Sequence, residues 1–359
     1  MLLNGGVRAN ACKSLAALTA LLALGLIWHA AAGSAIAQPA AATPSGSIIT
    51  GTVVDEVTGQ PLDRANVFLG STMLGASTGQ GGGFLLRGIP NGSYKLACSR
   101  VGYTRSLVSV EFTAPDSIYL DIALAPRPIS MDTVRVTGLR PEEWNRYLKV
   151  FLKAFLGDRP NAGMCEVINP EVLDLRLDRP TGLLTASTDS LLHVENRALG
   201  YRLDVMLLEF SWSVRRDNGH WAIVPRFTAR ESSDLHERAR WARNRRDTFA
   251  GSLDHFLAAL ASGKPGDQGF VTARRGRGLP PRMPTLAPIP GTSLLSVTFP
   301  DWLQVEYSRN VPSTRGMIRL TEACAVIDSL GTNFTPYCFE ISGDWADYGV
   351  ADMLPRDWR

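Results

Sequence analysis

Short runs of alternating apolar and polar residues fill the stretch from Ile48 to Phe112, and turn-forming residues separate them. Apolar side chains at every second position predict strands with one buried face and one solvated face. Thr58-Gly59 and Asn91-Gly92 supply the positive φ that tight turns need, and Gly79 to Gly83 suit a connection rather than a strand interior. About seven strands fit between Ser47 and Ala125, which predicts a sandwich of two small antiparallel sheets.

The same stretch carries a set of spaced motifs. They are I-x-G-x-V at Ile49, T-G-x-P-L at Thr58, A-x-V at Ala65, G-x-F at Gly82, G-I-P-x-G-x-Y at Gly88 and V-G-Y at Val101. In this pattern the chain resembles the carboxypeptidase regulatory-like domain, a transthyretin-like (prealbumin-like) seven-stranded β-sandwich. The resemblance implies a sandwich over residues 47–126 and implies export, because such modules occur on many secreted and cell-envelope proteins. It also implies a carbohydrate-binding-like fold.

The resemblance does not extend to a peptidase. A zinc carboxypeptidase needs two imidazoles and a carboxylate on one metal, usually begun by H-x-x-E. The residues three positions after the five histidines are Ala, Asn, Ile, Ala and Ala, for His29, His193, His220, His236 and His255. The sequence therefore predicts no carboxypeptidase site, no metal and no cofactor.

The first 37 residues have the pattern of a signal peptide. Arg8 and Lys13 precede an apolar run from Leu15 to Trp28, and Ala35-Ile36-Ala37 supplies the small residues that signal peptidase requires. A membrane anchor is the alternative, but a spanning helix needs roughly 20 apolar residues. We therefore expect an exported protein that begins at Gln38, with residues 38–46 as a disordered linker. The expected location is the periplasm, the outer membrane or the cell surface, with peripheral membrane association as an option.

The net charge bears on the class of partner, and the cysteines bear on disulfide bonds. Removing Arg8 and Lys13 lowers the formal net charge from +3 to +1, which argues against a nucleic-acid partner. Four cysteines would remain. Cys324 and Cys338 are candidates for a disulfide bond between neighbouring strands, which export permits, while buried free thiols are an equal alternative for Cys98 and Cys165. We expect an envelope protein or a glycan as partner, and the sequence leaves the oligomeric state open.

Residues 127–139 are predicted to form a linker with a short strand. Within it, Asp132 to Gly138 resembles the segment that joins such a sandwich to the plug of TonB-dependent outer-membrane receptors. A barrel of about 22 strands with about ten residues each would consume the rest of the chain. This excludes the transporter itself and leaves an accessory component of a TonB-dependent system as an alternative function.

An amphipathic helix follows the linker. Trp144, Tyr147, Phe151 and Phe155 recur at helical spacing, with Pro141 suited to the first turn and Gly157 to the end. An aromatic stripe of this kind most often packs in a core, which predicts a helix packed against the second domain. A helix that binds a partner or a membrane surface would show the same pattern.

Residues 140–359 are predicted to form a β-rich α+β domain with two or three helices. Between Tyr201 and Arg215 the apolar alternation changes parity, which predicts a β-bulge or a strand that changes its covering partner. Asp217-Asn218-Gly219 predicts a hairpin turn. The stretch from Gly263 to Gly291 is rich in glycine and proline and is predicted to be a loop. Several blocks, among them Asn161-Ala162 with Cys165 and the C-terminal DMLPRD, resemble uncharacterised Bacteroidetes-type envelope proteins that carry the same N-terminal module.

Few residues in this second domain are candidates for chemistry. Ser252, Asp254 and His255 have the residue types of a hydrolase triad, but no nucleophile elbow accompanies them. The preferred interpretation is that Ser252 caps a helix and His255 packs. Glu195, Asn196 and Tyr201 could line a polar binding pocket, although a turn fixed by side-chain hydrogen bonds is the simpler explanation.

A run of arginines between Arg226 and Arg246 raises the question of a basic surface for anionic glycans or lipid headgroups. At 100° per residue these arginines scatter around a helix, so solvated or snorkelling side chains are favoured. The sequence as a whole predicts a non-enzymatic cell-envelope binding or assembly protein that binds carbohydrate or protein. An unrecognised hydrolase in the C-terminal domain is the alternative from another class.

Overall fold

A computed structural model describes residues 46–127, 140–274, 283–309, 313–335, 337–356 and 358. The expected signal peptide and the segment Asp132 to Gly138 lie outside these residues. The fold class agrees with the prediction: a β-sandwich comes first, and a β-rich region with three helices follows. Among the described residues, no helix is both long enough and apolar enough to span a membrane.

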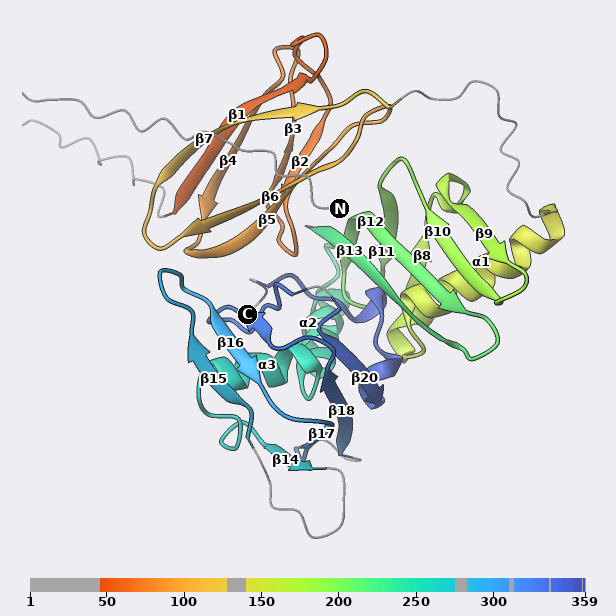
Figure 1. The fold of residues 1–359 in the computed structure, drawn as a ribbon, viewed down its shortest axis with the longest axis vertical. Coiled ribbons are helices and arrows are strands. Elements are labelled where there is room, and N and C mark those ends of the chain that lie inside the picture. Colours follow the sequence, from red (N-terminus) through yellow and green to blue (C-terminus); the bar gives the residue numbers. More distant parts are fainter. Residues whose placement is uncertain are drawn as a thin grey trace, which may run out of the picture. The chain divides into compact units, whose positions relative to one another are not determined.

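Seven strands form the sandwich, whose two layers are visible in Figure 1. One sheet has the order β4-β1-β7, with bounds Gly83–Ile89, Ser47–Asp55 and Ser117–Leu124. The other has the order β3-β2-β5-β6, with bounds Gly75–Ser77, Asn66–Leu69, Gly92–Ser99 and Ser106–Phe112. Alternate residues of β1, such as Ile49 and Val53, are fully buried between the layers. The predicted alternation is therefore confirmed.

One strand pair differs from the prediction of antiparallel sheets. β1 and β7 pair in parallel over eight residues, from Ile48 opposite Ser117 to Asp55 opposite Leu124. These are the first and last strands of the sandwich, so the rest of the sandwich connects them and no tight turn has to join them. The sequence pattern of a strand cannot reveal such a pairing, because apolar and polar residues alternate in the same way in parallel and antiparallel strands.

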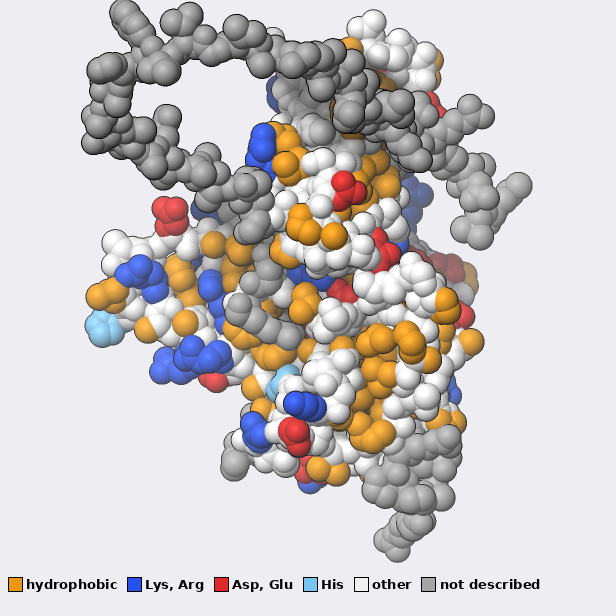
Figure 2. All heavy atoms as spheres, turned by 90° about the vertical axis from the view of Figure 1, so that its left-hand side faces the viewer, with side chains coloured by type: hydrophobic (Ala, Val, Ile, Leu, Met, Phe, Trp, Pro, Cys, Tyr) orange, Lys and Arg blue, Asp and Glu red, His pale blue; other side chains and the backbone are white. Residues whose placement is uncertain are grey.

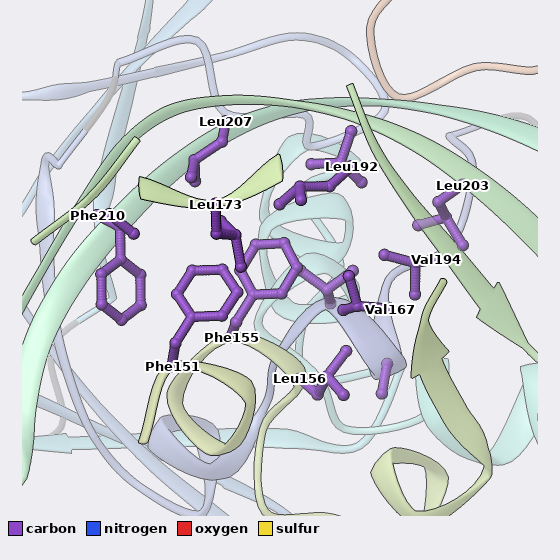
Figure 3. Packing of buried hydrophobic residues seen from close by; sticks show 14 of the residues in the cluster. Phe151, Phe155, Leu156, Val167, Leu173, Leu192, Val194, Leu203, Leu207 and Phe210 are labelled. Carbon is purple, nitrogen blue, oxygen red and sulfur yellow. The ribbon is translucent and has the colours of Figure 1, made fainter. Parts of the chain in front are cut away.

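A second sheet and a helix follow. The six strands are β8 (Cys165–Val167), β9 (Asp174–Asp178), β10 (Leu183–Ser187), β11 (Leu192–Asn196), β12 (Tyr201–Ser213) and β13 (Asn218–Ala229). Their order is β8-β11-β12-β10-β9, and β13 pairs with β12. Helix α1 (Pro141–Leu156) lies across one face of this sheet in Figure 1. Its Phe151 and Phe155 are fully buried and point into the cluster in Figure 3. The predicted packing of this helix is confirmed.

The predicted β-bulge is present in β12. Its register with β13 shifts between Leu207 and Glu209, so Leu208 lacks a cross-strand partner. The extra residue moves apolar side chains from one face of the strand to the other and leaves Leu208 43% exposed. The predicted hairpin turn is also confirmed, because β12 and β13 are joined through Asp217, which has a φ of 49°.

The last part of the chain contains two helices and two small sheets. Helix α2 (Leu235–Phe249) and helix α3 (Leu253–Ala261) precede them. One sheet orders its strands β14-β17-β18-β20, with bounds Phe270–Arg274, Leu303–Tyr307, Thr314–Leu320 and Phe339–Gly343. The other orders them β15-β16-β19, with bounds Thr285–Pro288, Leu295–Thr298 and Ala325–Ile327. Short 3-10 turns at Pro160–Met164, Pro170–Val172, Asp344–Asp347 and Val350–Asp352 complete the elements.

The predicted loop from Gly263 to Gly291 is wrong in part. β14 and β15 both lie within this stretch, where they pair with β17 and β16. Glycine and proline content indicated a loop, but pairing with a strand elsewhere in the chain satisfies the backbone groups of these short segments. Propensity over such short segments is therefore overridden by tertiary pairing.

The arginines of α2 do not form one basic stripe. Arg245 places its guanidinium 4.1 Å from the centroid of the Tyr201 ring and donates to the carbonyl of Leu199 at 2.7 Å. Burial lowers the pKa of Arg245. On the face shown in Figure 2, lysine and arginine side chains lie in small groups among hydrophobic and uncharged ones. Arg245 thus behaves as the snorkelling interpretation predicts.

Candidate functional site

Ser252 and His255 lie at the start of α3. Ser252 is the N-cap residue, and its Oγ accepts a hydrogen bond from the backbone N–H of His255 at 3.1 Å. The His255 ring accepts from the backbone N–H of Gly251 and lies 3.0 Å from the Gln268 side-chain oxygen. It also packs against the rings of Phe249, Phe270 and Tyr307. These contacts support the capping and packing interpretation over a catalytic pair.

Replacing Ser252 by alanine is expected to lower the free energy of unfolding by about 1 kcal/mol, because the first turn of α3 would lose its side-chain acceptor. Ser252→Asn keeps an acceptor and should recover most of this loss. Urea denaturation of the three proteins measures the difference. An unchanged stability in Ser252→Ala would contradict the capping role.

The second group of candidates fixes a turn. Asn196 is fully buried; its Nδ2 donates to the carbonyl of Ala351 at 2.8 Å, and its Oδ1 accepts from the N–H of Leu199 at 2.9 Å. Tyr201 is buried in the core under Arg245, and Glu195 forms ion pairs with Arg197 and Arg230. Asn196 therefore fixes the turn and joins it to the C-terminal segment, whereas Tyr201 is part of the core and Glu195 is engaged in ion pairs.

The four cysteines that the structure describes are free thiols. The candidate disulfide bond between Cys324 and Cys338 is not formed in the structure. Cys98 and Cys165 are free as well, and burial raises the pKa of each thiol to about 12. Within the described ranges, no cluster of three or more His, Cys, Asp and Glu side chains could hold a metal ion.

Sequence blocks that are far apart meet in one buried polar cluster. Asn161 Nδ2 donates to Asp352 Oδ1 and to Thr248 Oγ1, each at 2.8 Å. Arg159 Nε lies 3.6 Å from the same Asp352 oxygen and stacks on Tyr348. Burial raises the pKa of Asp352. This cluster joins the C-terminal segment to the region after α1, which is a structural role for residues of the DMLPRD and Asn161 blocks.

A cavity of about 500 Å³ is a concave feature that sequence reasoning missed. Its walls come from β5, β6, the turn after β2, the β12–β13 hairpin, the end of α2, the start of α3, residues 330–335, Tyr337 and the C-terminal segment. The aromatic lining residues are Tyr94, Trp221, Phe249, Phe334, Tyr337 and Trp358. The polar ones include Ser71, Ser93, Lys95, Asp254, Thr332, Asn333, Thr335 and Arg356. Because they come from separate segments, no local motif could reveal the site.

Apolar contact holds the first wall in place. Phe68 and Ala97 of the sandwich are buried together with Leu191, Met206 and Val224. Backbone hydrogen bonds extend this contact, from Ser71 N–H to the Pro225 carbonyl at 2.7 Å and from Phe227 N–H to the Thr72 carbonyl at 2.8 Å. The turn after β2 therefore lies along β13, and the sandwich supplies one side of the cavity.

Arg356 joins the C-terminal segment to the sandwich at the cavity. Its guanidinium pairs with Asp328, donates to the Ser93 carbonyl at 2.7 Å and lies 4.4 Å from the centroid of the Tyr94 ring. The side chains of Arg356 and Asp328 are only 7% and 2% exposed. Asp328 Oδ1 also accepts from the N–H groups of Leu330 and Thr332, each at 2.9 Å. One buried ion pair thus orders the C-terminal segment and the loop that begins at Leu330.

The exposed residues that line the cavity include apolar side chains beside the polar Lys95, Asp254 and Asn333. Leu107, Leu208, Leu330 and Tyr337 line the cavity and are among the exposed large hydrophobic residues of the described chain. Leu107 belongs to β6 and Leu208 to the β12 bulge, whereas Leu330 and Tyr337 lie between β19 and β20. Ligand sites are typically concave and mostly apolar, with a few polar groups that fix orientation. The cavity has this composition, and its volume falls in the range of small-molecule sites, about 300–1,000 Å³.

Comparison with known proteins identifies the first domain. Residues 49–136 match the family model described as CarboxypepD_reg-like domain. The chain therefore carries such a domain, in agreement with the resemblance of its motifs. No curated protein sequence matches the chain at a significant level.

Solved structures give only remote likenesses. The Bacillus anthracis TIE protein is 18% identical, with a TM-score of 0.21, over 23% of this chain and 17% of that chain. BcpA, the major pilin subunit of Bacillus cereus, is 15% identical, with a TM-score of 0.21, over 23% and 31%. A putative carbohydrate binding protein from Bacteroides uniformis is 8% identical, with a TM-score of 0.20, over 84% and 99%. The chain spans less than a third of the first two proteins.

Proposed function

We propose that the protein is a non-enzymatic binding protein of the cell envelope and that its cavity binds carbohydrate. The observation that carries the proposal is the combination of aromatic and polar side chains around one cavity of about 500 Å³. A sugar ring presents C–H groups on its faces and hydroxyl groups at its edge. Aromatic rings pack against the former, and hydrogen-bonding side chains satisfy the latter.

Other features support binding rather than catalysis. Ser252 and His255 are engaged as a helix cap and a packed ring. The CarboxypepD_reg-like domain supplies a wall of the cavity through Tyr94 and Lys95, so this domain would contact a ligand bound there. Export is proposed from the signal-peptide pattern of the first 37 residues, and assignment to the Bacteroidetes-type envelope proteins rests on the sequence blocks.

The test is titration of the protein lacking residues 1–37 with cellotriose, maltotriose and triacetylchitotriose, by calorimetry and by tryptophan fluorescence. Trp221 and Trp358 both line the cavity, so a bound sugar should change their emission. Trp358→Ala is expected to weaken binding at least about tenfold, which corresponds to about 1.4 kcal/mol. Trp358→Phe keeps an aromatic surface and should lose less affinity than Trp358→Ala.

Tyr119→Ala is the matched control, because Tyr119 is an exposed aromatic residue on β7 that does not line the cavity. Its affinity should equal that of the unmodified protein. Failure of all three trisaccharides to bind would overturn the proposal. Loss of binding in Tyr119→Ala, with full binding in Trp358→Ala, would move the site to the outer face of the sandwich.

A further inference from the structure

The β12 bulge places a polar side chain beside the cavity rim. Because the register shifts between Leu207 and Glu209, Leu208 projects at the rim and Glu209 pairs with Ala222 of β13. Bulges redirect side chains and are frequent next to binding sites. Glu209 then contacts two groups from different segments: His220 of β13 and Tyr337, which precedes β20.

These contacts hold the Tyr337 ring in one place. The Tyr337 hydroxyl donates to Glu209 Oε2 at 2.6 Å, and His220 Nε2 lies 3.0 Å from Glu209 Oε1. The His220 and Tyr337 rings meet edge to face, with centroids 5.1 Å apart. The hydrogen bonds from Tyr337 and His220 lower the pKa of Glu209, so it stays a charged acceptor at neutral pH. The hydroxyl group and the ring of Tyr337 are therefore both held by side chains of the β12–β13 pair.

The backbone of Tyr337 is also unusual. Its φ is 56°, in the left-handed region that a bulky residue rarely adopts. Such conformations persist where surrounding contacts impose them, and they cluster at ligand sites. Despite these constraints, Tyr337 remains 42% exposed and lines the cavity. A rigid aromatic ring with open surface at a cavity rim is suited to stacking against a flat apolar group.

We propose that Tyr337 is the specificity-determining residue of the cavity, as a platform for the C–H face of a pyranose ring, and that Glu209 and His220 position it. This inference rests on the proposed carbohydrate binding. The ring is the contact with the ligand, whereas Glu209 acts through Tyr337. Maltotriose, whose axial glycosidic oxygens interrupt one C–H face, should therefore bind less tightly than cellotriose, whose linked rings carry equatorial substituents only.

The test compares affinities for the same three trisaccharides. Tyr337→Ala should weaken binding at least about tenfold, and Tyr337→Phe should lose less because the ring remains. Glu209→Ala should weaken binding by several fold, because the ring is no longer held. Glu209→Gln keeps an acceptor for the Tyr337 hydroxyl and should restore most of the affinity. Tyr119→Ala, an exposed tyrosine whose hydroxyl lies 3.4 Å from Thr52 Oγ1, is the matched control.

The outcomes separate the two proposals. Binding that is lost in Trp358→Ala but unchanged in Tyr337→Ala would leave the proposed function intact and overturn the platform role. Equal affinities in Glu209→Ala and Glu209→Gln would overturn the positioning role. Absence of binding by any of the three sugars to the unmodified protein would overturn both. Thermal unfolding of each variant identifies any loss that comes from misfolding.

Discussion

Arg356→Ala is expected to lower the free energy of unfolding by about 3–5 kcal/mol, because the substitution leaves a buried carboxylate without its cation. The Asp328 side chain is 2% exposed and pairs with Arg356. The variant also loses the hydrogen bond to the Ser93 carbonyl and the contact with the Tyr94 ring.

A double variant without either charge distinguishes the destabilisation caused by the unpaired charge from that caused by the lost packing. Arg356→Met with Asp328→Asn removes both charges, keeps the Arg356 stem volume and keeps an acceptor for the N–H groups of Leu330 and Thr332. This double variant should be much more stable than Arg356→Ala. Arg64→Ala is the surface control, since the Arg64 side chain is 85% exposed beside Asp63, and should change stability by less than about 0.5 kcal/mol.

Urea or guanidinium denaturation measures these differences. A loss below about 1 kcal/mol in Arg356→Ala would show that the pair behaves like a surface ion pair. Because Arg356 lines the cavity, the same variant should also bind sugar less well. A destabilised protein with full affinity would contradict the role of Arg356 in shaping the cavity.

Phe151→Ala is expected to cost about 3–5 kcal/mol of the free energy of unfolding, the usual range for removing a buried phenylalanine ring. Phe151 is fully buried, and its ring centroid lies 4.9 Å from that of Phe155 and 4.7 Å from that of Phe210. The loss combines the transfer of the ring to water with a cavity between α1 and the sheet (Figure 3).

Two variants on the same helix calibrate this result. Phe151→Leu keeps much of the apolar volume and should lose clearly less than Phe151→Ala. Lys149→Ala, at an exposed position of α1, should change stability by less than about 0.5 kcal/mol. If Phe151→Ala and Lys149→Ala were equally stable, α1 would not pack as described.

Local patterns predicted several elements correctly. The β1 alternation, the α1 stripe, the change of parity in β12 and the hairpin at Asp217 all appear in the structure. Each depends on which side chains face the core along one segment, and a linear pattern records that directly. The helix-cap interpretation of Ser252 has the same basis, because capping involves residues only three positions apart.

Features that need partners from distant segments were missed. Pairing within the Gly263–Gly291 stretch involves β16 and β17, and glycine and proline content gave no sign of it. Glu195, Asn196 and Tyr201 were considered as pocket residues, yet the hydrogen bond from Asn196 to Ala351 spans 155 positions and has a structural purpose. The cavity itself joins aromatic residues from Tyr94 to Trp358.

The amino-acid sequence by itself determined the strand-rich class, the CarboxypepD_reg-like domain and the buried face of α1, because periodicity and turn chemistry act over a few residues. Only the tertiary structure decided that β1 pairs in parallel with β7, that Arg356 meets Asp328, and that Glu209 meets Tyr337. These contacts depend on how the whole chain closes its loops, which no local pattern encodes. The alternation between Ile48 and Phe112 thus defines a sandwich, and the cavity beside it depends on the rest of the chain.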